Sequence, residues 1–199
     1  MVPEAPLEDT GEGVVPAGEG WFVLNTKDAR WRDDGPLGKL TFFEGTGEFW
    51  EIGFNVGVLE PGHPMAMYHY ETDQEDFLIL SGEALLIVEG EERPLRAWDF
   101  VHCPPGTDHI IVGAGTGPCV VVSTGSRVNA EGDWGGYTVD EAALRHGAGV
   151  ETATKDPKEA YAPFPERRFT VIVLTNRNAG EPGVIAERIA DRLLFGAAR

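Results

Sequence analysis

The chain has 199 residues, of which 42% are hydrophobic, so it can bury the core of one domain and is too apolar for wholesale disorder. Sixteen Lys and Arg against 33 Asp and Glu give a net charge of −17, which disfavours nucleic acids and anionic membranes as partners. Because neither a signal peptide nor an apolar run of membrane length is visible, we expect a cytoplasmic protein.

Residues 1–20 contain five acidic and no basic side chains, together with Pro and Gly, and this composition predicts a disordered acidic arm. Short apolar segments separated by turn residues then recur up to about residue 128. The segments are residues 21–24, 40–44, 49–59, 75–82, 83–90, 98–105, 109–115 and 119–125. Short strands at this spacing predict an all-β antiparallel sandwich or barrel over residues 21–128. Within it, Ser81-Gly82 predicts a tight hairpin whose glycine takes a positive φ.

Residues 129–166 are polar and contain Gly, which predicts an irregular extension after the strands. One short helix is expected over residues 139–146, with Asp140 as its N-terminal cap and Gly147 at its end. The two cysteines of the chain, Cys103 and Cys119, are too few for a disulfide scaffold. We expect both thiols to be reduced and buried.

Residues 167–199 differ from the rest, because six Arg stand against three acidic residues. A buried strand over residues 169–174 and an amphipathic helix over residues 184–194 are predicted. This pair resembles the closing strand and helix of β-lactamase-like serine hydrolases. The Ser-x-x-Lys and Lys-Thr-Gly motifs of those enzymes are absent, so the resemblance implies no hydrolase chemistry. We expect the pair to dock on the barrel or to mediate self-association.

Polar side chains suited to a metal gather among the strand segments. If residues 64–71 are extended, His69 and Glu71 share one face of the strand. Glu75 begins the next strand segment, and His109 follows a Pro-Pro-Gly turn. Two imidazoles and one or two carboxylates in a mostly apolar barrel would form a nitrogen and oxygen site for a divalent transition metal.

Two spaced motifs make the sequence similar to the cupin superfamily. The first motif ends as Glu75-Asp-Phe-Leu-Ile-Leu-Ser-Gly82, and the second contains Pro104-Pro105-Gly106-Thr107-Asp108-His109. The resemblance covers roughly residues 50–125. It implies a double-stranded β-helix, or jelly-roll barrel, with a metal site formed by the two motifs and an irregular C-terminal extension ending in a strand and a helix.

The first motif departs from the family, which normally has His-x-His before the Glu. With three residues before Glu75, His69 and Glu71 take the two His positions; with four, Tyr68 and Tyr70 take them. Side-chain alternation favours the first register, whereas counting forward from Gly62 favours the second. In the second motif, Trp98 stands where the family usually has Gly, and Gly113 stands where it often has Asn.

The resemblance and the alternation together assign a ligand set. The expected metal ligands are His69, Glu71, Glu75 and His109, holding Fe, Mn, Ni or Zn. Because these ligands must be deprotonated, metal binding should weaken in mild acid. The expected pocket residues are Met67, Tyr68, Phe77 and His102. No catalytic residue is assigned, although Tyr68 and His102 are candidates for an acid or base, and the face of the strand that His102 takes stays open. The tryptophans, Trp134 among them, are expected to serve packing.

Two functions remain open from the sequence. The first is an enzyme, a metal-dependent dioxygenase or isomerase acting on a small oxygen-bearing molecule, which is what the resemblance implies. The second is a non-catalytic cupin that binds or senses a small molecule and uses the metal to hold the ligand or the fold. A third, metal-free barrel would have its carboxylates in solvent. By analogy with the family, pairing of edge strands into a homodimer is also expected.

Overall fold

The computed structural model describes residues 1–47, 49–129 and 132–164. The chain divides into two compact units, Met1–Ala160 and Tyr161–Arg199. In the second unit the Phe164 amide donates a hydrogen bond to the Tyr161 carbonyl at 2.9 Å. The strand and the helix predicted within residues 167–199 lie outside the described residues.

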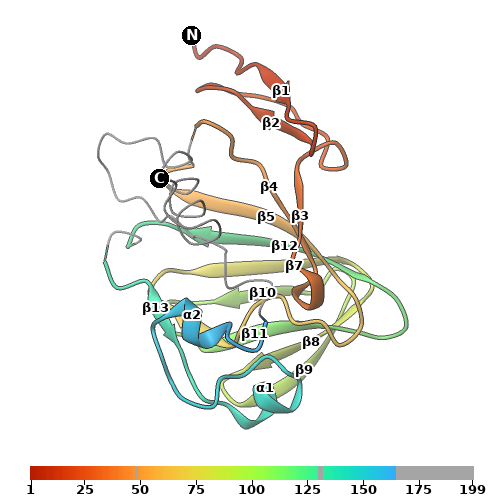
Figure 1. The fold of residues 1–199 in the computed structure, drawn as a ribbon, viewed down its shortest axis with the longest axis vertical. Coiled ribbons are helices and arrows are strands. Elements are labelled where there is room, and N and C mark those ends of the chain that lie inside the picture. The colour runs from red at the N-terminus through yellow and green to blue at the C-terminus, as the bar shows by residue number, and fades with distance from the viewer. Residues whose placement is uncertain (48, 130–131, 165–199) are drawn as a thin grey trace, which may run out of the picture. The chain divides into compact units, whose positions relative to one another are not determined.

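Two antiparallel sheets form the body of the first unit (Figure 1). The larger sheet has the strand order β10-β7-β12-β5-β4-β3. Its strands are β3 (Trp31–Asp33), β4 (Lys39–Phe42), β5 (Ile52–Leu59), β7 (Glu75–Ser81), β10 (Phe100–Cys103) and β12 (Cys119–Ser126). A 3-10 turn, η1 (Gly35–Leu37), joins β3 to β4.

The smaller sheet has the strand order β13-β6-β11-β8-β9. Its strands are β6 (His69–Glu71), β8 (Glu83–Val88), β9 (Glu91–Arg96), β11 (His109–Ala114) and β13 (Gly135–Tyr137). From β5 to β13 consecutive strands alternate between the two sheets, except for the β8–β9 hairpin within the smaller sheet, which is typical of a jelly-roll barrel. The predicted all-β barrel is confirmed.

The core lies between the two sheets, because both contribute side chains to one buried cluster. The cluster consists of Leu59, Phe77, Ile79, Ala84, Leu86, Val101, Cys103, Ile111, Cys119 and Val121. Strand alternation explains it, since every second residue of β7 and β12 points inward. A fully buried aliphatic side chain of this kind stabilises the fold by about 1.5–3 kcal/mol. Cys103 and Cys119 are both buried and free, as predicted.

The turn between β7 and β8 lies at Gly82, which has the predicted positive φ, at +78°. The tight hairpin expected here is wrong, because β7 and β8 do not pair and belong to different sheets. A Cβ at this position would lie 2.5 Å from the Pro118 carbonyl oxygen. Glycine is therefore required by both the turn and the close approach of the neighbouring chain. The register of β7, and with it the position of Glu75, is set by pairing with β10 and β12, where Glu75 lies opposite Cys103 and Gly125.

Residues 1–20, for which the composition predicts a disordered arm, contain a short hairpin. It joins β1 (Leu7–Asp9) to β2 (Val14–Pro16). The β-branched pair Val14 and Val15 suits a strand, and Ala5 and Val15 are buried at 2% and 8% exposure. Local apolar contacts thus order part of a segment whose overall composition is acidic.

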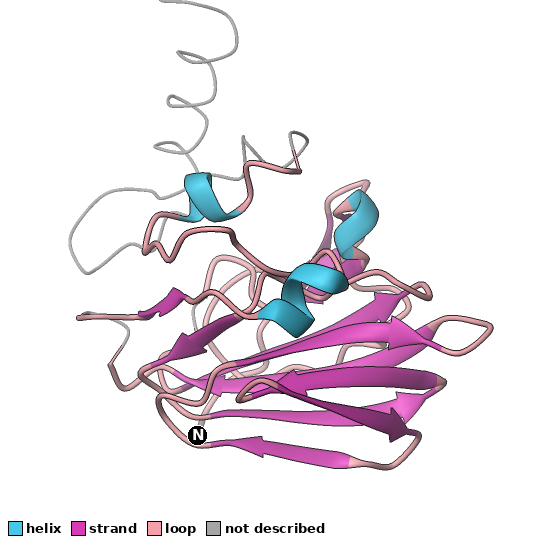
Figure 2. Cartoon of the chain, turned by 90° about the horizontal axis from the view of Figure 1, so that it is seen from below, coloured by secondary structure: helices cyan, strands magenta, loops and turns pink. Residues whose placement is uncertain are grey.

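The extension after β12 packs against the outer face of the smaller sheet. Its first helix, α1 (Glu141–Arg145), begins at Asp140, whose carboxylate accepts from the Ala143 amide at 2.8 Å. The helix expected over residues 139–146 is thus confirmed, with Gly147 at a φ of +67° after it. Ala142 and Ala143 pack on a second buried cluster that includes Ile87 and Ile110. Figure 2 shows the helices on one side of the strands.

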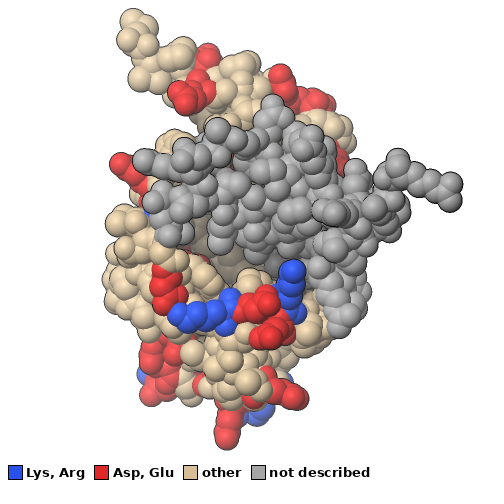
Figure 3. All heavy atoms as spheres, turned by 60° about the vertical axis from the view of Figure 1, so that its left-hand side comes forward, with Lys and Arg blue, Asp and Glu red and all other residues tan. Residues whose placement is uncertain are grey.

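A second helix, α2 (Pro157–Ala160), lies in a stretch that the sequence predicts to be irregular. The Asp156 carboxylate accepts from the Lys158 amide at 2.8 Å and so begins the turn. Among the described helices, none has the length and apolar character that crossing a membrane requires. On the face in Figure 3, acidic side chains are widely spread and the basic ones lie beside them, in keeping with the net charge.

Candidate metal centre

Three strands bring a polar side chain to the same end of the barrel. His69 begins β6, Glu75 begins β7 and His109 begins β11. β6 and β11 are neighbours, and their two histidines pair directly, with ring centroids 5.1 Å apart. Glu75 belongs to the opposite sheet, so the group joins the two sheets.

The ligand atoms of these three residues converge. His109 Nε2 lies 3.2 Å and His69 Nε2 lies 3.7 Å from the same oxygen, Glu75 Oε2. All three ligand atoms lie within 4.8 Å of one another. The side chains are 12%, 17% and 3% exposed for His69, Glu75 and His109, so the group is largely shielded from bulk water.

Hydrogen bonds at the far side of each ring fix its orientation. His69 Nδ1 lies 2.7 Å from the Met67 carbonyl oxygen, and His109 Nδ1 lies 2.9 Å from the Thr107 carbonyl oxygen. A carbonyl oxygen only accepts, so both Nδ1 atoms donate a proton and both Nε2 atoms are left to face Glu75. Histidine ligands of metals are oriented by such outer hydrogen bonds.

Two atoms of the group are buried without a hydrogen-bond partner, namely Glu75 Oε2 and His109 Nε2. An unsatisfied buried polar atom destabilises a fold by about 1–3 kcal/mol. A cation between these atoms would satisfy both of them. The residues present therefore fit a metal ion, and the nitrogen and oxygen donors fit a divalent transition metal.

The charges of the group are strongly coupled. Burial lowers the pKa of His69. Burial also opposes ionisation of Glu75, but the two imidazoles outweigh it and hold the pKa of Glu75 below its usual value. For His109, burial acts to lower the pKa, but the Cys103 thiol and the Glu75 carboxylate raise it to about 10. In the metal-free protein a proton on His109 thus offsets the Glu75 charge, and a metal ion would replace that proton.

Glu71, the fourth predicted ligand, lies at the edge of the group. Its Oε1 is 3.9 Å from His69 Nε2, and its side chain is 33% exposed. Burial and the nearby charge of Glu75 raise the pKa of Glu71 to about 8. Of the two registers that the sequence allows, the structure has the one in which His69 and Glu71 share the inner face.

The predicted pocket residues take different places. The Phe77 ring centroid lies 5.3 Å from that of His109, and Met67 is buried at 1% exposure. Tyr68 packs in the second cluster, on the outer face of the smaller sheet, where its hydroxyl accepts from the Gly90 amide at 3.4 Å. Burial there raises the pKa of Tyr68 to about 12. His102 is half exposed, and its Nδ1 lies 2.6 Å from the Asp76 carboxylate. The structure thus does not bring Tyr68 and His102 to the group.

Two aromatic residues at the site come from the extension, where the sequence analysis expects only packing. β13 pairs with β6 so that Tyr137 lies opposite His69. The rings of Trp134 and Tyr137 lie 6.4 and 6.0 Å from that of His69. No local sequence signal marks this contact, because it depends on the long-range pairing of β13 with β6.

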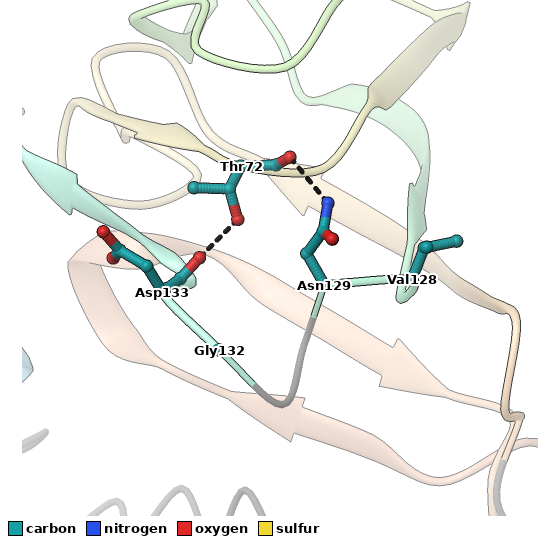
Figure 4. A pocket seen from close by; sticks show the side chains of 5 residues that line it. All are labelled: Thr72, Val128, Asn129, Gly132 and Asp133. Carbon is teal, nitrogen blue, oxygen red and sulfur yellow. Dashed lines mark hydrogen bonds between the residues drawn. The ribbon is translucent and has the colours of Figure 1, made fainter.

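The segment that leads to Trp134 is tied to the loop between β6 and β7. Asp73, buried in that loop, accepts from the Asn129 amide at 2.8 Å, and Asn129 Nδ2 donates to the Thr72 carbonyl at 3.1 Å. Figure 4 shows this bond and a second one, from the Thr72 hydroxyl to the Asp133 carbonyl. A shallow pocket of about 520 Å³ lies between the two segments. Asp73 thus anchors the extension to the loop between β6 and β7.

Comparison with known proteins agrees with this geometry. Residues 55–125 match the family described as "Cupin domain". No curated protein has a sequence similar enough to count as a match. No comparison supports the resemblance of residues 167–199 to β-lactamase-like hydrolases.

Solved structures with a similar fold include a sugar phosphate isomerase from a cupin superfamily of Silicibacter pomeroyi, at 21% identity and a TM-score of 0.48, covering 53% of this chain and 76% of that one. An RmlC-like cupin from Shewanella frigidimarina has 20% identity and a TM-score of 0.45, covering 52% and 87%. A predicted oxalate decarboxylase from Thermotoga maritima has 18% identity and a TM-score of 0.46, covering 52% and 97%.

Proposed function

Because residues 55–125 match the cupin domain family, we propose that the protein binds one divalent transition metal where His69, Glu75 and His109 converge, and uses it to hold a small oxygen-bearing molecule. His69, Glu75 and His109 would be the ligands, with Glu71 as a fourth. The observation that carries the proposal is the convergence of two Nε2 atoms on one carboxylate oxygen, with two of these buried atoms lacking any other partner.

The ligand set favours particular metals. Two imidazoles and one or two carboxylates suit Fe(II), Mn, Ni and Zn better than Cu. With both carboxylates bound, the ligand charges balance those of the metal, which makes burial tolerable. A bound metal of this kind supplies a Lewis acid for oxygen ligands and, as iron, a site for oxygen chemistry.

The residues around the ligand atoms limit the chemistry that the site can support. The Phe77 ring packs beside His109, and the low exposure of both histidine side chains, 12% and 3%, shields their ligand atoms from water. Glu71 is the more accessible of the two carboxyl groups, with a side chain 33% exposed against 17% for Glu75. It is the group placed to exchange a proton or a hydrogen bond with a bound molecule. On this basis a metal-dependent dioxygenase or isomerase is the enzymatic form of the proposal.

A second candidate is a cupin that binds or senses a small molecule without turning it over. One observation favours it: Tyr68 and His102, the two acid or base candidates of the sequence, lie away from the group. If Glu71 also ligates the metal, the described residues leave no side chain in an evident acid or base role. The two candidates share the metal site and differ in turnover.

Elemental mass spectrometry on protein purified without a His tag tests the proposal. We expect about one ion of Fe, Mn, Ni or Zn per chain. The ion should be lost in His69→Ala and in His109→Ala. His102→Ala is the matched control, because this histidine is half exposed and bound to Asp76. The control should retain the metal.

An empty parent protein that also fails to take up each of the four added metals would contradict the proposal. So would a parent whose metal survives in both site variants. Circular dichroism of each variant shows whether loss of metal reflects loss of the ligand or loss of the fold.

A further inference from the structure

Aromatic rings flank both histidines of the metal centre. Phe77 lies beside His109, with ring centroids 5.3 Å apart. On the other side, Trp134 and Tyr137 lie beside His69, and their own rings meet edge to face at 5.2 Å. Trp134 and Tyr137 come from the extension, not from the barrel strands that carry the ligands. We call these two residues the aromatic wall.

The backbone is shaped to place the aromatic wall. Tyr137 lies opposite His69 in the pairing of β13 with β6, so it faces the barrel interior. Simple alternation would turn Trp134 to the opposite face from Tyr137. Gly135, between them, has a φ of +139°, and a Cβ there would lie 2.0 Å from the Tyr70 carbonyl oxygen. Only glycine fits this position, and its conformation brings Trp134 to the same side as Tyr137.

The aromatic wall is held firmly and keeps an open surface. The Thr72 amide donates to the Trp134 carbonyl at 3.0 Å, next to the Thr72 contact with Asp133 drawn in Figure 4. Tyr137 is buried at 7% exposure, whereas Trp134 is only partly buried. Trp134 precedes Gly135, which pairs with Glu71, the most exposed of the predicted ligands. A partly exposed indole thus lies near His69 and next in sequence to the residue that pairs with Glu71.

Charge at the site disfavours a strongly anionic ligand. Within residues 1–47, 49–129 and 132–164, the four predicted ligands form ion pairs only with one another. These are His69, Glu71, Glu75 and His109. No Lys or Arg in that part of the chain is paired with them. Within the part of the chain that the structure describes, a phosphate would find the metal but no Lys or Arg paired with its ligands, whereas a flat apolar group would find aromatic surface.

We propose that Trp134 is a specificity-determining residue of the metal site, and that the site takes an oxygen chelator carrying a flat aromatic or conjugated group, which packs on the indole. The inference rests on the proposed function, because the chelating oxygens must reach the metal first. A ring packed on the aromatic wall gains both burial and the preferred edge or offset geometry of aromatic pairs.

Two hydroxamates test the inference, because they carry the same chelating group and differ only in their substituent. Benzohydroxamate has a phenyl group and acetohydroxamate a methyl group. Both are titrated calorimetrically into the full chain loaded with Co²⁺, whose visible absorption reports metal uptake by itself. We expect benzohydroxamate to bind about tenfold more tightly than acetohydroxamate.

Variants of Trp134 assign the preference to the aromatic wall. Trp134→Ala should lower the ratio of the two affinities to about twofold or less, with the acetohydroxamate affinity unchanged. Trp134→Phe keeps a flat ring and should keep most of the preference, even if the alanine variant folds poorly. Trp98→Ala is the matched control, since this tryptophan is 76% exposed on the turn before β10, and it should leave the ratio unchanged.

The outcomes separate this inference from the proposed function. A parent that takes up no Co²⁺ overturns both. A parent that takes up Co²⁺ but binds the two hydroxamates equally overturns only the inference. If Trp134→Ala weakens both hydroxamates to the same degree, Trp134 positions His69 instead of contacting the ligand, and the specificity role is overturned.

Discussion

The two ends of the barrel interior are built from different kinds of side chain. Leu59, Ile79, Cys119 and Val121 fill one end, which we call the packed end, and each is at most 1% exposed. His69, Glu75 and His109 occupy the other end, which we call the site end. The same strand, β7, contributes Ile79 to the packed end and Glu75 to the site end.

The comparison separates two requirements that one barrel has to meet. Apolar contacts at the packed end are not directional. Different apolar side chains of similar volume can therefore stabilise the fold there. Polar atoms at the site end have direction, and two of them lack a partner within the described residues. We therefore expect substitutions at the packed end to change stability and those at the site end to change metal binding.

Loss of a site-end ligand should have the largest effect. His109→Ala removes one of three converging donors and should weaken metal affinity by about 100-fold or more. The free energy of unfolding of the metal-free protein should fall as well, because the buried Glu75 carboxylate loses the imidazole 3.2 Å from its Oε2. Competition with a coloured chelator measures the first quantity, and urea unfolding in EDTA measures the second. Equal metal affinity in parent and variant would contradict this account of the site end.

A cavity at the packed end should change stability alone. Ile79 is fully buried, so Ile79→Ala should lower the free energy of unfolding by about 2–5 kcal/mol. Metal affinity of the folded variant should stay within about twofold of the parent, because the cavity lies away from the ligand atoms. Urea unfolding and the same chelator competition provide both values. A large loss of metal affinity in the folded variant would show that the two ends are not independent.

A substitution in the extension, at Gly135, tests a region outside the two ends of the barrel. Gly135→Ala places a Cβ against the Tyr70 carbonyl and should destabilise the pairing of β13 with β6 by about 1–3 kcal/mol. Faster amide hydrogen exchange in β13, with little change in β7 and β12, is the expected pattern. Unchanged exchange in β13 would mean that the backbone tolerates a side chain at this position.

The two carboxylates at the site end, Glu71 and Glu75, should contribute unequally to metal affinity. Glu71→Gln keeps the shape of the side chain but removes its charge, and we expect about a tenfold loss of metal affinity. Glu75→Gln should approach the loss seen for His109→Ala, because Glu75 lies between both histidines. Equal losses for the two variants would place Glu71 among the central ligands, and no loss in Glu71→Gln would remove it from the ligand set.

A polar contact outside the barrel interior should have the smallest effect. Arg127 donates to the Glu44 carboxylate, with Nη2 at 3.0 Å from Oε2. Burial opposes ionisation of Glu44, but bonds from Arg127 and the Phe49 amide outweigh it and lower its pKa below 4.5. Since the pair is partly exposed, Glu44→Gln should lower the free energy of unfolding at neutral pH by only about 1 kcal/mol.

The pH dependence of this contact follows from the direction of the pKa shift. The folded state holds the ionised form of Glu44 more tightly, so its stabilisation is complete above the ordinary pKa of 4.5. It is lost as the pH falls through the lower pKa of the folded state. The unfolding free energies of parent and Glu44→Gln should therefore converge once the pH is below the pKa of Glu44 in the folded state. A difference that persists in acid would assign the effect to something other than the charge.

The fold and the central site residues could be predicted because their signals are local. Period-two alternation indicates the strands, Gly82 indicates a turn with a positive φ, and the spacing from Glu75 to His109 indicates the motif pair. The preference for His69 over Tyr68 also follows from alternation, which the paired strands preserve. Each of these features depends on a few adjacent residues.

Features that depend on distant pairing could not be predicted. The face that His102 takes is set by its pairing with Asp76 in β7, and both faces of its strand carry apolar residues. The place of Trp134 depends on the pairing of β13 with β6 and on one glycine conformation. Composition alone also missed the hairpin within residues 1–20, because two buried residues outweigh the acidic average there.

A crystal structure of the protein soaked with Zn²⁺, with anomalous diffraction at the zinc edge, tests the central claim most directly. The account predicts one strong peak at about 2.0–2.2 Å from Nε2 of His69, Nε2 of His109 and a carboxylate oxygen of Glu75. A peak bound only to surface carboxylates, or three ligand side chains with no metal between them, would contradict it.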